Sequence, residues 1–105
     1  MTLQTHIDIS KEPCAITMSQ ELMFEDHKTF KDLISQIENS GRSNWVFDIS
    51  GLRNIDSAGL GMLLFAHEQS QANNWSFQVA GAQGQVHKML ELTQLGRILQ
   101  IQPAE

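Results

Sequence analysis

The chain has 105 residues, of which 41% are hydrophobic and 18% charged, and a formal net charge of -5. This size and composition are typical of one globular domain over residues 1–105 and exclude a disordered chain. The seven Lys and Arg residues do not cluster, which argues against nucleic acid as a partner. With no apolar run of the roughly 20 residues that span a bilayer, and no signal-peptide pattern, we expect a cytoplasmic protein without membrane association.

The first half of the sequence predicts two strands, a helix and a third strand. Residues 3–9 alternate apolar and polar side chains, as in a half-buried strand, and residues 13–18 complete a hairpin. In residues 25–40 the apolar positions recur at i, i+3, i+4 and i+7, with Gly41 just past the end, which predicts an amphipathic helix. Residues 45–49 form a nearly continuous apolar run, typical of a central parallel strand covered on both faces.

The second half alternates helices and strands. We predict a helix over residues 57–73, a strand over 75–80, a helix over 85–95 and a last short strand over 98–101. The element order is then ββαβαβαβ. Strands that alternate with helices predict parallel pairs joined by right-handed crossovers, so we expect an α/β fold with a mixed, mostly parallel sheet and helices packed against it.

Enzymatic and metal motifs are incomplete in this sequence. His67 begins a zinc-protease-like pattern, but Gln71 stands where the second metal ligand is needed. A nucleophile elbow would need Gly in place of Ile55, and a dinucleotide fingerprint starting at residues 59–61 would need Gly in place of Leu64. We therefore expect no enzymatic activity, no cofactor and no metal site.

Residues 48–61 carry the most information, and we interpret them as a strand end, a polar turn and a helix start with two glycines, Gly59 and Gly61. Each glycine costs about 1 kcal/mol relative to Ala in a helix interior, so we expect another backbone to approach closely. Ser57 could simply cap this helix. Alternatively, the free amides and the dipole of the helix would stabilise a phosphate on Ser57, which beside Asp56 would repel an acidic or tightly packed partner.

Two stretches of this segment closely resemble the signature of the STAS domain (sulfate transporter and anti-sigma factor antagonist), especially that of bacterial anti-sigma factor antagonists. They are Asp48-Ile49-Ser50-Gly51-Leu52 and Ile55-Asp56-Ser57-Ala58-Gly59-Leu60-Gly61. The element order fits that family over nearly the whole chain. One departure is Met23, which stands where many relatives carry an acidic residue.

The resemblance implies a switch. Ser57 would be phosphorylated by an anti-sigma factor with serine kinase activity, and the unphosphorylated form would bind that partner and so free a sigma factor. A PP2C-type phosphatase would reset the switch. The partner surface expected around the phosphorylation site comprises Asp56, Ser57, Ala58, Gly59, Gly61, Met62 and Phe65.

Helical geometry places Leu60, Leu63, Leu64 and His67 on the face that should meet the sheet. Met62 and Phe65 lie outside that face, so either other helices or a partner must cover them.

Two other functions stay open from the sequence. The domain could be a constitutive subunit of a larger assembly, such as the STAS component of some lipid-transport ATPases, with Ser57 acting only as a cap. It could also be a sensor that binds a nucleotide or another small anion at the same helix end.

Overall fold

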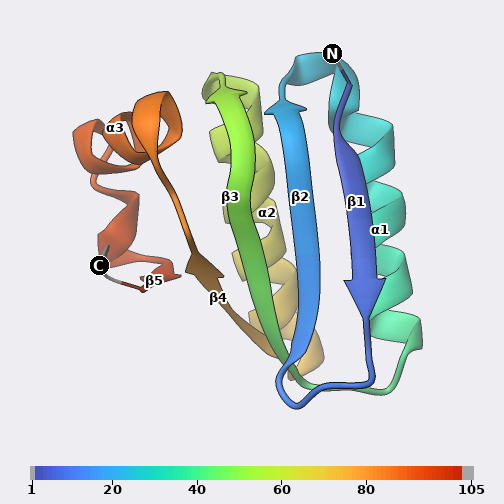
Figure 1. The fold of residues 1–105 in the computed structure, drawn as a ribbon. Coiled ribbons are helices and arrows are strands. Elements are labelled where there is room, and N and C mark those ends of the chain that lie inside the picture. The colour runs from blue at the N-terminus through green and yellow to red at the C-terminus, as the bar shows by residue number, and fades with distance from the viewer. Residues whose placement is uncertain (1, 103–105) are drawn as a thin grey trace.

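Five strands and three helices follow one another in the predicted order along residues 2–102, which are the residues that the computed structural model describes (Figure 1). They are β1 (Gln4–Asp8), β2 (Cys14–Leu22), α1 (His27–Asn39), β3 (Asn44–Ile55), α2 (Ser57–Asn73), β4 (Ser76–Ala80), α3 (Gly84–Leu92) and β5 (Gln100–Ile101). Two short 3-10 turns, η1 (Phe24–Asp26) and η2 (Leu95–Arg97), precede α1 and β5.

The strands form one sheet in the order β1-β2-β3-β4-β5. The pair β1 and β2 is antiparallel and every other pair is parallel, which confirms the predicted mixed sheet with an antiparallel edge. Within residues 2–102, no helix is long and apolar enough to span a bilayer.

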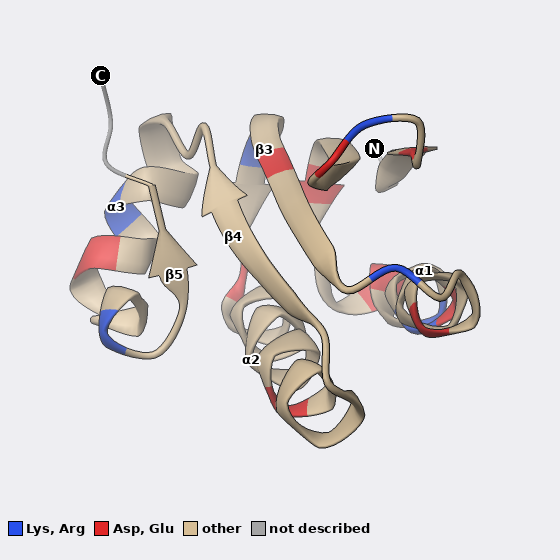
Figure 2. Ribbon diagram, turned by 90° about the horizontal axis from the view of Figure 1, so that it is seen from below, with Lys and Arg blue, Asp and Glu red and all other residues tan. Residues whose placement is uncertain are grey.

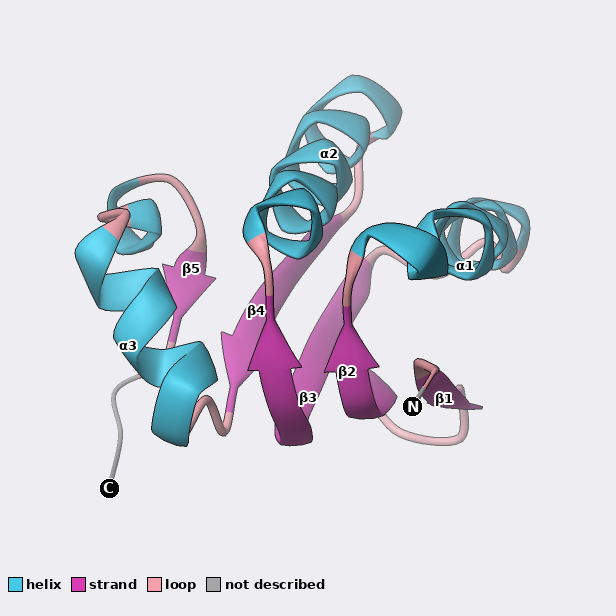
Figure 3. Ribbon diagram, turned by 90° about the horizontal axis from the view of Figure 1, so that it is seen from above, coloured by secondary structure: helices cyan, strands magenta, loops and turns pink. Residues whose placement is uncertain are grey.

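The helices α1 and α2 lie on one side of the sheet, and α3 lies toward the edge formed by β4 and β5 (Figure 3). The predicted apolar stripe of α1 is confirmed, because Phe30, Leu33, Ile34 and Ile37 are all buried. They meet the inward side chains of the sheet, among them Trp45 and Phe47 of β3. The expectation that β3 is covered on both faces is wrong: with these helices on one side only, the outward-facing Val46 and Asp48 remain partly exposed.

The central strand β3 is longer than predicted. It continues through Ile55 over the residues interpreted as a polar turn, and β2 likewise continues to Leu22. The two strands stay paired up to Leu22 and Ile55, but the register shifts twice on the way. Irregularities of this kind break the two-residue alternation by which a strand is recognised.

The C-terminal elements are shorter than predicted. α3 ends at Leu92 because Gln94 adopts a left-handed conformation (φ 57°), and the Thr93 hydroxyl donates to the Met89 carbonyl at 2.8 Å. Of the remainder of the predicted helix, Thr93 and Gln94 form a turn and Leu95 begins η2. The last strand consists of two residues, paired with β4 through Gln100 and Ile101.

Candidate functional site

The N-terminus of α2 is capped by Asp56, not by Ser57. One carboxylate oxygen of Asp56 (Oδ1) accepts the Gly59 N–H at 2.7 Å, and the other (Oδ2) accepts the Phe24 N–H at 3.0 Å. This single side chain therefore satisfies one of the free amides of the helix and also joins α2 to η1. The interpretation of Ser57 as the cap is corrected accordingly.

Ser57 is the first residue of α2, and its side chain is exposed. Within residues 2–102 its hydroxyl has no hydrogen-bond partner. It stands at the positive end of the helix dipole, where a negative charge is stabilised. An added phosphate would meet solvent and a favourable field there, and no internal hydrogen bond would be lost.

Gly59 confirms the expected close approach of another backbone, and that backbone belongs to the same chain. A Cβ at this position would collide with the Leu22 carbonyl oxygen and lie 2.7 Å from Cγ1 of Ile55. Gly59 is buried. Its role lies in seating α2 against the ends of β2 and β3.

Gly61 differs from Gly59 in this respect. It is exposed, and a Cβ there would meet no atom within 4 Å. The packing of the chain on itself therefore does not require glycine at position 61.

A groove of about 250 Å³ runs between α1 and α2. Its lining residues are His27, Phe30 and Lys31 from α1, and Ala58, Gly61, Met62 and Phe65 from α2. Four residues of the predicted partner surface thus lie together in one groove. The sequence did not decide whether the domain itself or a partner covers Met62 and Phe65. In the structure Met62 is buried, with 5% of its surface exposed, whereas Phe65 is half-buried.

The charge of the groove comes from α1 alone. α2 contains no Lys or Arg, and Glu68 is its only acidic residue (Figure 2). On α1, Nζ of Lys31 lies 6.0 Å from the centroid of the Phe65 ring, at the outer range of a cation–π contact. The groove is therefore mostly apolar, and Lys31 is the lining residue that carries a formal charge.

The face of α2 predicted to meet the sheet is largely confirmed. Leu60 and Leu63 are buried, and Leu64 and His67 are half-buried.

Sequence reasoning missed Phe24, whose side chain is 74% exposed directly beside the start of α2. It also missed the buried carboxylate of Asp26, which accepts the Leu3 N–H at 3.0 Å and the Met23 N–H at 2.8 Å. A buried acid that receives these two backbone N–H groups holds together the start of β1 and the end of β2.

The end of β3 is fixed by a side chain of α3. The Gln85 amide accepts the Ile55 N–H at 2.9 Å and donates to the Ile55 carbonyl at 3.0 Å. Gln83 adds a bond to the Ser50 carbonyl at 2.6 Å. These contacts hold the strand that leads into Asp56 and Ser57.

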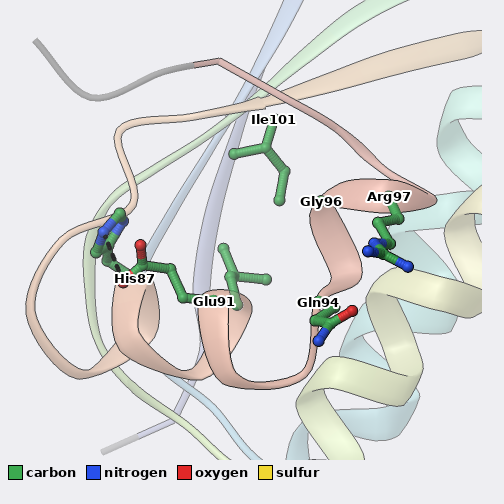
Figure 4. A pocket seen from close by; sticks show the side chains of 7 residues that line it. His87, Glu91, Gln94, Gly96, Arg97 and Ile101 are labelled. Carbon is green, nitrogen blue, oxygen red and sulfur yellow. Dashed lines mark ion pairs between the residues drawn. The ribbon is translucent and has the colours of Figure 1, made fainter.

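A second cavity, of about 320 Å³, lies at the other edge of the sheet and is formed by α3, η2 and β5 (Figure 4). Its lining residues are His87, Leu90, Glu91, Gln94, Gly96, Arg97 and Ile101. Nε2 of His87 lies 3.3 Å from Oε1 of Glu91, and both side chains face solvent. None of the predicted partner residues lines this cavity. Within residues 2–102, no three His, Cys, Asp or Glu side chains are grouped so that they could hold a metal ion.

Several solved structures share this fold. An anti-sigma factor antagonist from Mycobacterium paratuberculosis matches with a TM-score of 0.83 and 17% identity, over 97% of this chain and 86% of that one. The anti-sigma factor antagonist SpoIIAA in its unphosphorylated form matches with a TM-score of 0.71 and 16% identity, over 97% and 90% of the two chains. The phosphorylated form of SpoIIAA from Bacillus matches with a TM-score of 0.65 and 14% identity, over 95% and 92%.

At these identities the structures establish the common fold, and the family follows from the sequence match. A family model described as "Mlab, STAS domain" matches residues 5–101, which is nearly the whole chain. The protein is therefore a member of the STAS domain family.

Proposed function

We propose that this STAS domain is an anti-sigma factor antagonist whose binding is switched by phosphorylation of Ser57. The observation that carries the proposal is the position of Ser57, exposed and without a hydrogen-bond partner among the described residues, at the head of a helix that Asp56 already caps. The hydroxyl is thus free for modification without cost to the fold. The chain acts by binding, in the cytoplasm, and the catalytic step belongs to its partners.

The switch operates through charge. A phosphate adds about -1.5 to -2 charges at neutral pH, and the dipole of α2 stabilises that charge. The same charge, beside the Asp56 carboxylate, repels acidic groups and disfavours a closely packed partner. Phosphorylation therefore weakens docking and leaves the domain folded.

The partners follow from the direction of the switch. The unphosphorylated chain binds an anti-sigma factor that has serine kinase activity, and this binding releases a sigma factor. The same partner phosphorylates Ser57 and ends the association, and a PP2C-type phosphatase restores the binding form. The part of the predicted partner surface that is exposed or lines the groove is Ser57, Ala58, Gly61, Met62 and Phe65.

The test compares wild-type protein, Ser57→Ala and Ser57→Asp as baits in native lysate, with quantitative mass spectrometry of the captured proteins. Ser35→Asp is the matched control, because Ser35 is an exposed serine on α1 outside the groove. We expect one kinase-like protein to be captured by wild type, Ser57→Ala and Ser35→Asp, and to be lost from Ser57→Asp. With ATP, that purified protein should phosphorylate wild type but not Ser57→Ala.

A second function is favoured by the description of the matching family model, which names Mlab and not a sigma-factor regulator. In that case the chain is a constitutive subunit of a larger assembly, and Ser57 has no signalling role. All four baits would then capture the same set of proteins in equal amounts. Such a result would support the constitutive subunit and reject the phosphorylation switch.

A further inference from the structure

We infer that Phe24 is the anchor by which a partner protein docks, and that this partner has an apolar pocket for the Phe24 ring and a carboxylate opposite Lys31 in the α1–α2 groove. The inference rests on the proposed function and adds the chemistry of the partner surface.

The first observation is the exposure of Phe24. With 74% of its surface exposed, it is the most exposed of the large hydrophobic side chains of residues 2–102. Aromatic side chains are enriched among the few residues that dominate the energy of protein interfaces. Phe24 stands three residues before His27, the first groove-lining residue of α1, and its backbone N–H is bonded to Asp56, the residue before Ser57.

The second observation is that the backbone of Phe24 is held rigidly. Its N–H donates to Oδ2 of Asp56 at 3.0 Å. On one side of it, the Met23 N–H donates to Oδ2 of Asp26 at 2.8 Å, and the Asp26 N–H closes the turn on the Met23 carbonyl at 2.9 Å. An exposed aromatic ring on a fixed backbone loses little conformational entropy when a partner binds it.

The third observation is the charge of the α1–α2 groove. His27 and Lys31 are one helical turn apart on α1 and both line the groove. Within residues 2–102, Lys31 has no ion pair, and its only charge-related contact is with the Phe65 ring. In a chain with a net charge of -5, an unpaired lysine in an otherwise apolar groove is the complement of an apolar surface that carries a carboxylate.

These features explain how Ser57 could control the surface. A partner that places carboxylates against α1 brings negative charge to the head of α2. A phosphate on Ser57 then repels those carboxylates and also competes with them for Lys31. An aromatic ring with nearby cations could also bind an anionic membrane, but the net charge of -5 opposes approach to such a surface.

The first experiment is photo-cross-linking in the native cell, with p-benzoylphenylalanine at position 24 or at position 92. Leu92 is the matched control because it is 70% exposed, also apolar, and lies on α3 at the other edge of the sheet. We expect one cross-linked protein from position 24, none from position 92, and loss of the product when Ser57→Asp is combined with the label at position 24.

The second experiment measures affinity for the protein so identified. Phe24→Ala should weaken binding by about 30-fold or more, the level of an interface hot spot, while Leu92→Ala leaves affinity unchanged. Lys31→Glu should weaken binding by about tenfold, and the loss should diminish at high salt. Lys11→Glu makes the same charge change in the loop between β1 and β2, at the opposite end of the sheet, and should have no such effect.

These experiments test the Phe24 anchor separately from the phosphorylation switch. Absence of a specific cross-link from position 24, or unchanged affinity of Phe24→Ala, overturns the anchor, even where the proteins captured in the Ser57 experiment uphold the proposed function. A cross-link from position 24 that persists in Ser57→Asp upholds the anchor and rejects the phosphorylation switch. If the protein sediments with phosphatidylglycerol vesicles and Phe24→Ala does not, Phe24 docks on an anionic membrane and the protein partner is rejected.

Discussion

The Asp56 carboxylate and the Phe24 backbone N–H, 32 positions apart in the sequence, are joined by a hydrogen bond of 3.0 Å. The other oxygen of the same carboxylate caps α2. The segment before α1 and the start of α2 are thus fixed by one side chain.

The first prediction is that Asp56→Ala lowers the free energy of unfolding by about 1–3 kcal/mol, because it removes a helix cap and leaves a second N–H without its partner. Ser57→Ala is the adjacent control and should change stability by less than about 0.5 kcal/mol, as expected for an exposed side chain without such a role. Urea unfolding of both variants measures the difference. Equal losses in the two variants would contradict the assignment of the cap.

The second prediction contrasts the two glycines of α2. Gly59→Ala should destabilise the domain by about 2 kcal/mol or more, because its methyl group collides with the Leu22 carbonyl oxygen. Gly61→Ala should raise stability by a few tenths to about 1 kcal/mol, because the site is open and Ala is the better helix former.

The same Gly61→Ala variant tests the proposed docking surface. If the partner backbone passes over this turn, the added methyl group weakens binding while stability rises. The denaturant midpoint measures the stability of the variant, and titration calorimetry with the captured partner measures its affinity. Normal affinity in the more stable variant would place the docking surface elsewhere.

The third prediction concerns the buried carboxylate of Asp26, of which only 2% is exposed. Asp26→Asn replaces one accepting oxygen by an NH₂ group that must face a backbone N–H, so we expect a loss of about 1–3 kcal/mol. Glu25→Gln, an exposed neighbour, serves as the control and should have little effect. Thermal unfolding at neutral pH distinguishes them, and a stable Asp26→Asn variant would show that these two bonds contribute little.

The fourth prediction is a stabilising substitution at Gln20. This residue has φ 77° within β2, and its buried Oε1 has no hydrogen-bond partner among the described residues. Gln20→Gly relieves the left-handed strain and removes the unpaired oxygen, which should raise stability by about 1 kcal/mol. Thr17→Gly, on the same strand but with ordinary backbone geometry, should lower stability instead. A loss in both variants would argue that the Gln20 side chain contributes more packing than its strain costs.

The element order and the buried face of α1 were predictable from the sequence because they depend on local periodicity. The extension of β3 was not, since Ser50, Arg53 and Asn54 are polar and two register shifts interrupt the alternation. The cap was ambiguous because Asp and Ser are both good capping residues and stand next to each other.

A close approach of another backbone at Gly59 was predictable, because glycine destabilises a helix interior unless the position needs its lack of a side chain. The identity of the approaching atom, the Leu22 carbonyl oxygen, was not. The contact of Phe24 with Asp56 joins two distant segments, and no pattern within either segment signals it.

The Gln85 side-chain amide bonds backbone groups at the end of β3 that no neighbouring strand pairs. β4 pairs with β3 only as far as Asp48, so the last residues of β3 extend beyond their neighbour on that side. Strand backbone left unpaired in this way invites a strand of another molecule to add to it. By bonding both the N–H and the carbonyl of Ile55, the Gln85 side chain takes the place of the missing strand at that position. Both backbone groups of Ile55 are therefore bonded within the domain, at the point where its longest strand carries the start of α2 outward.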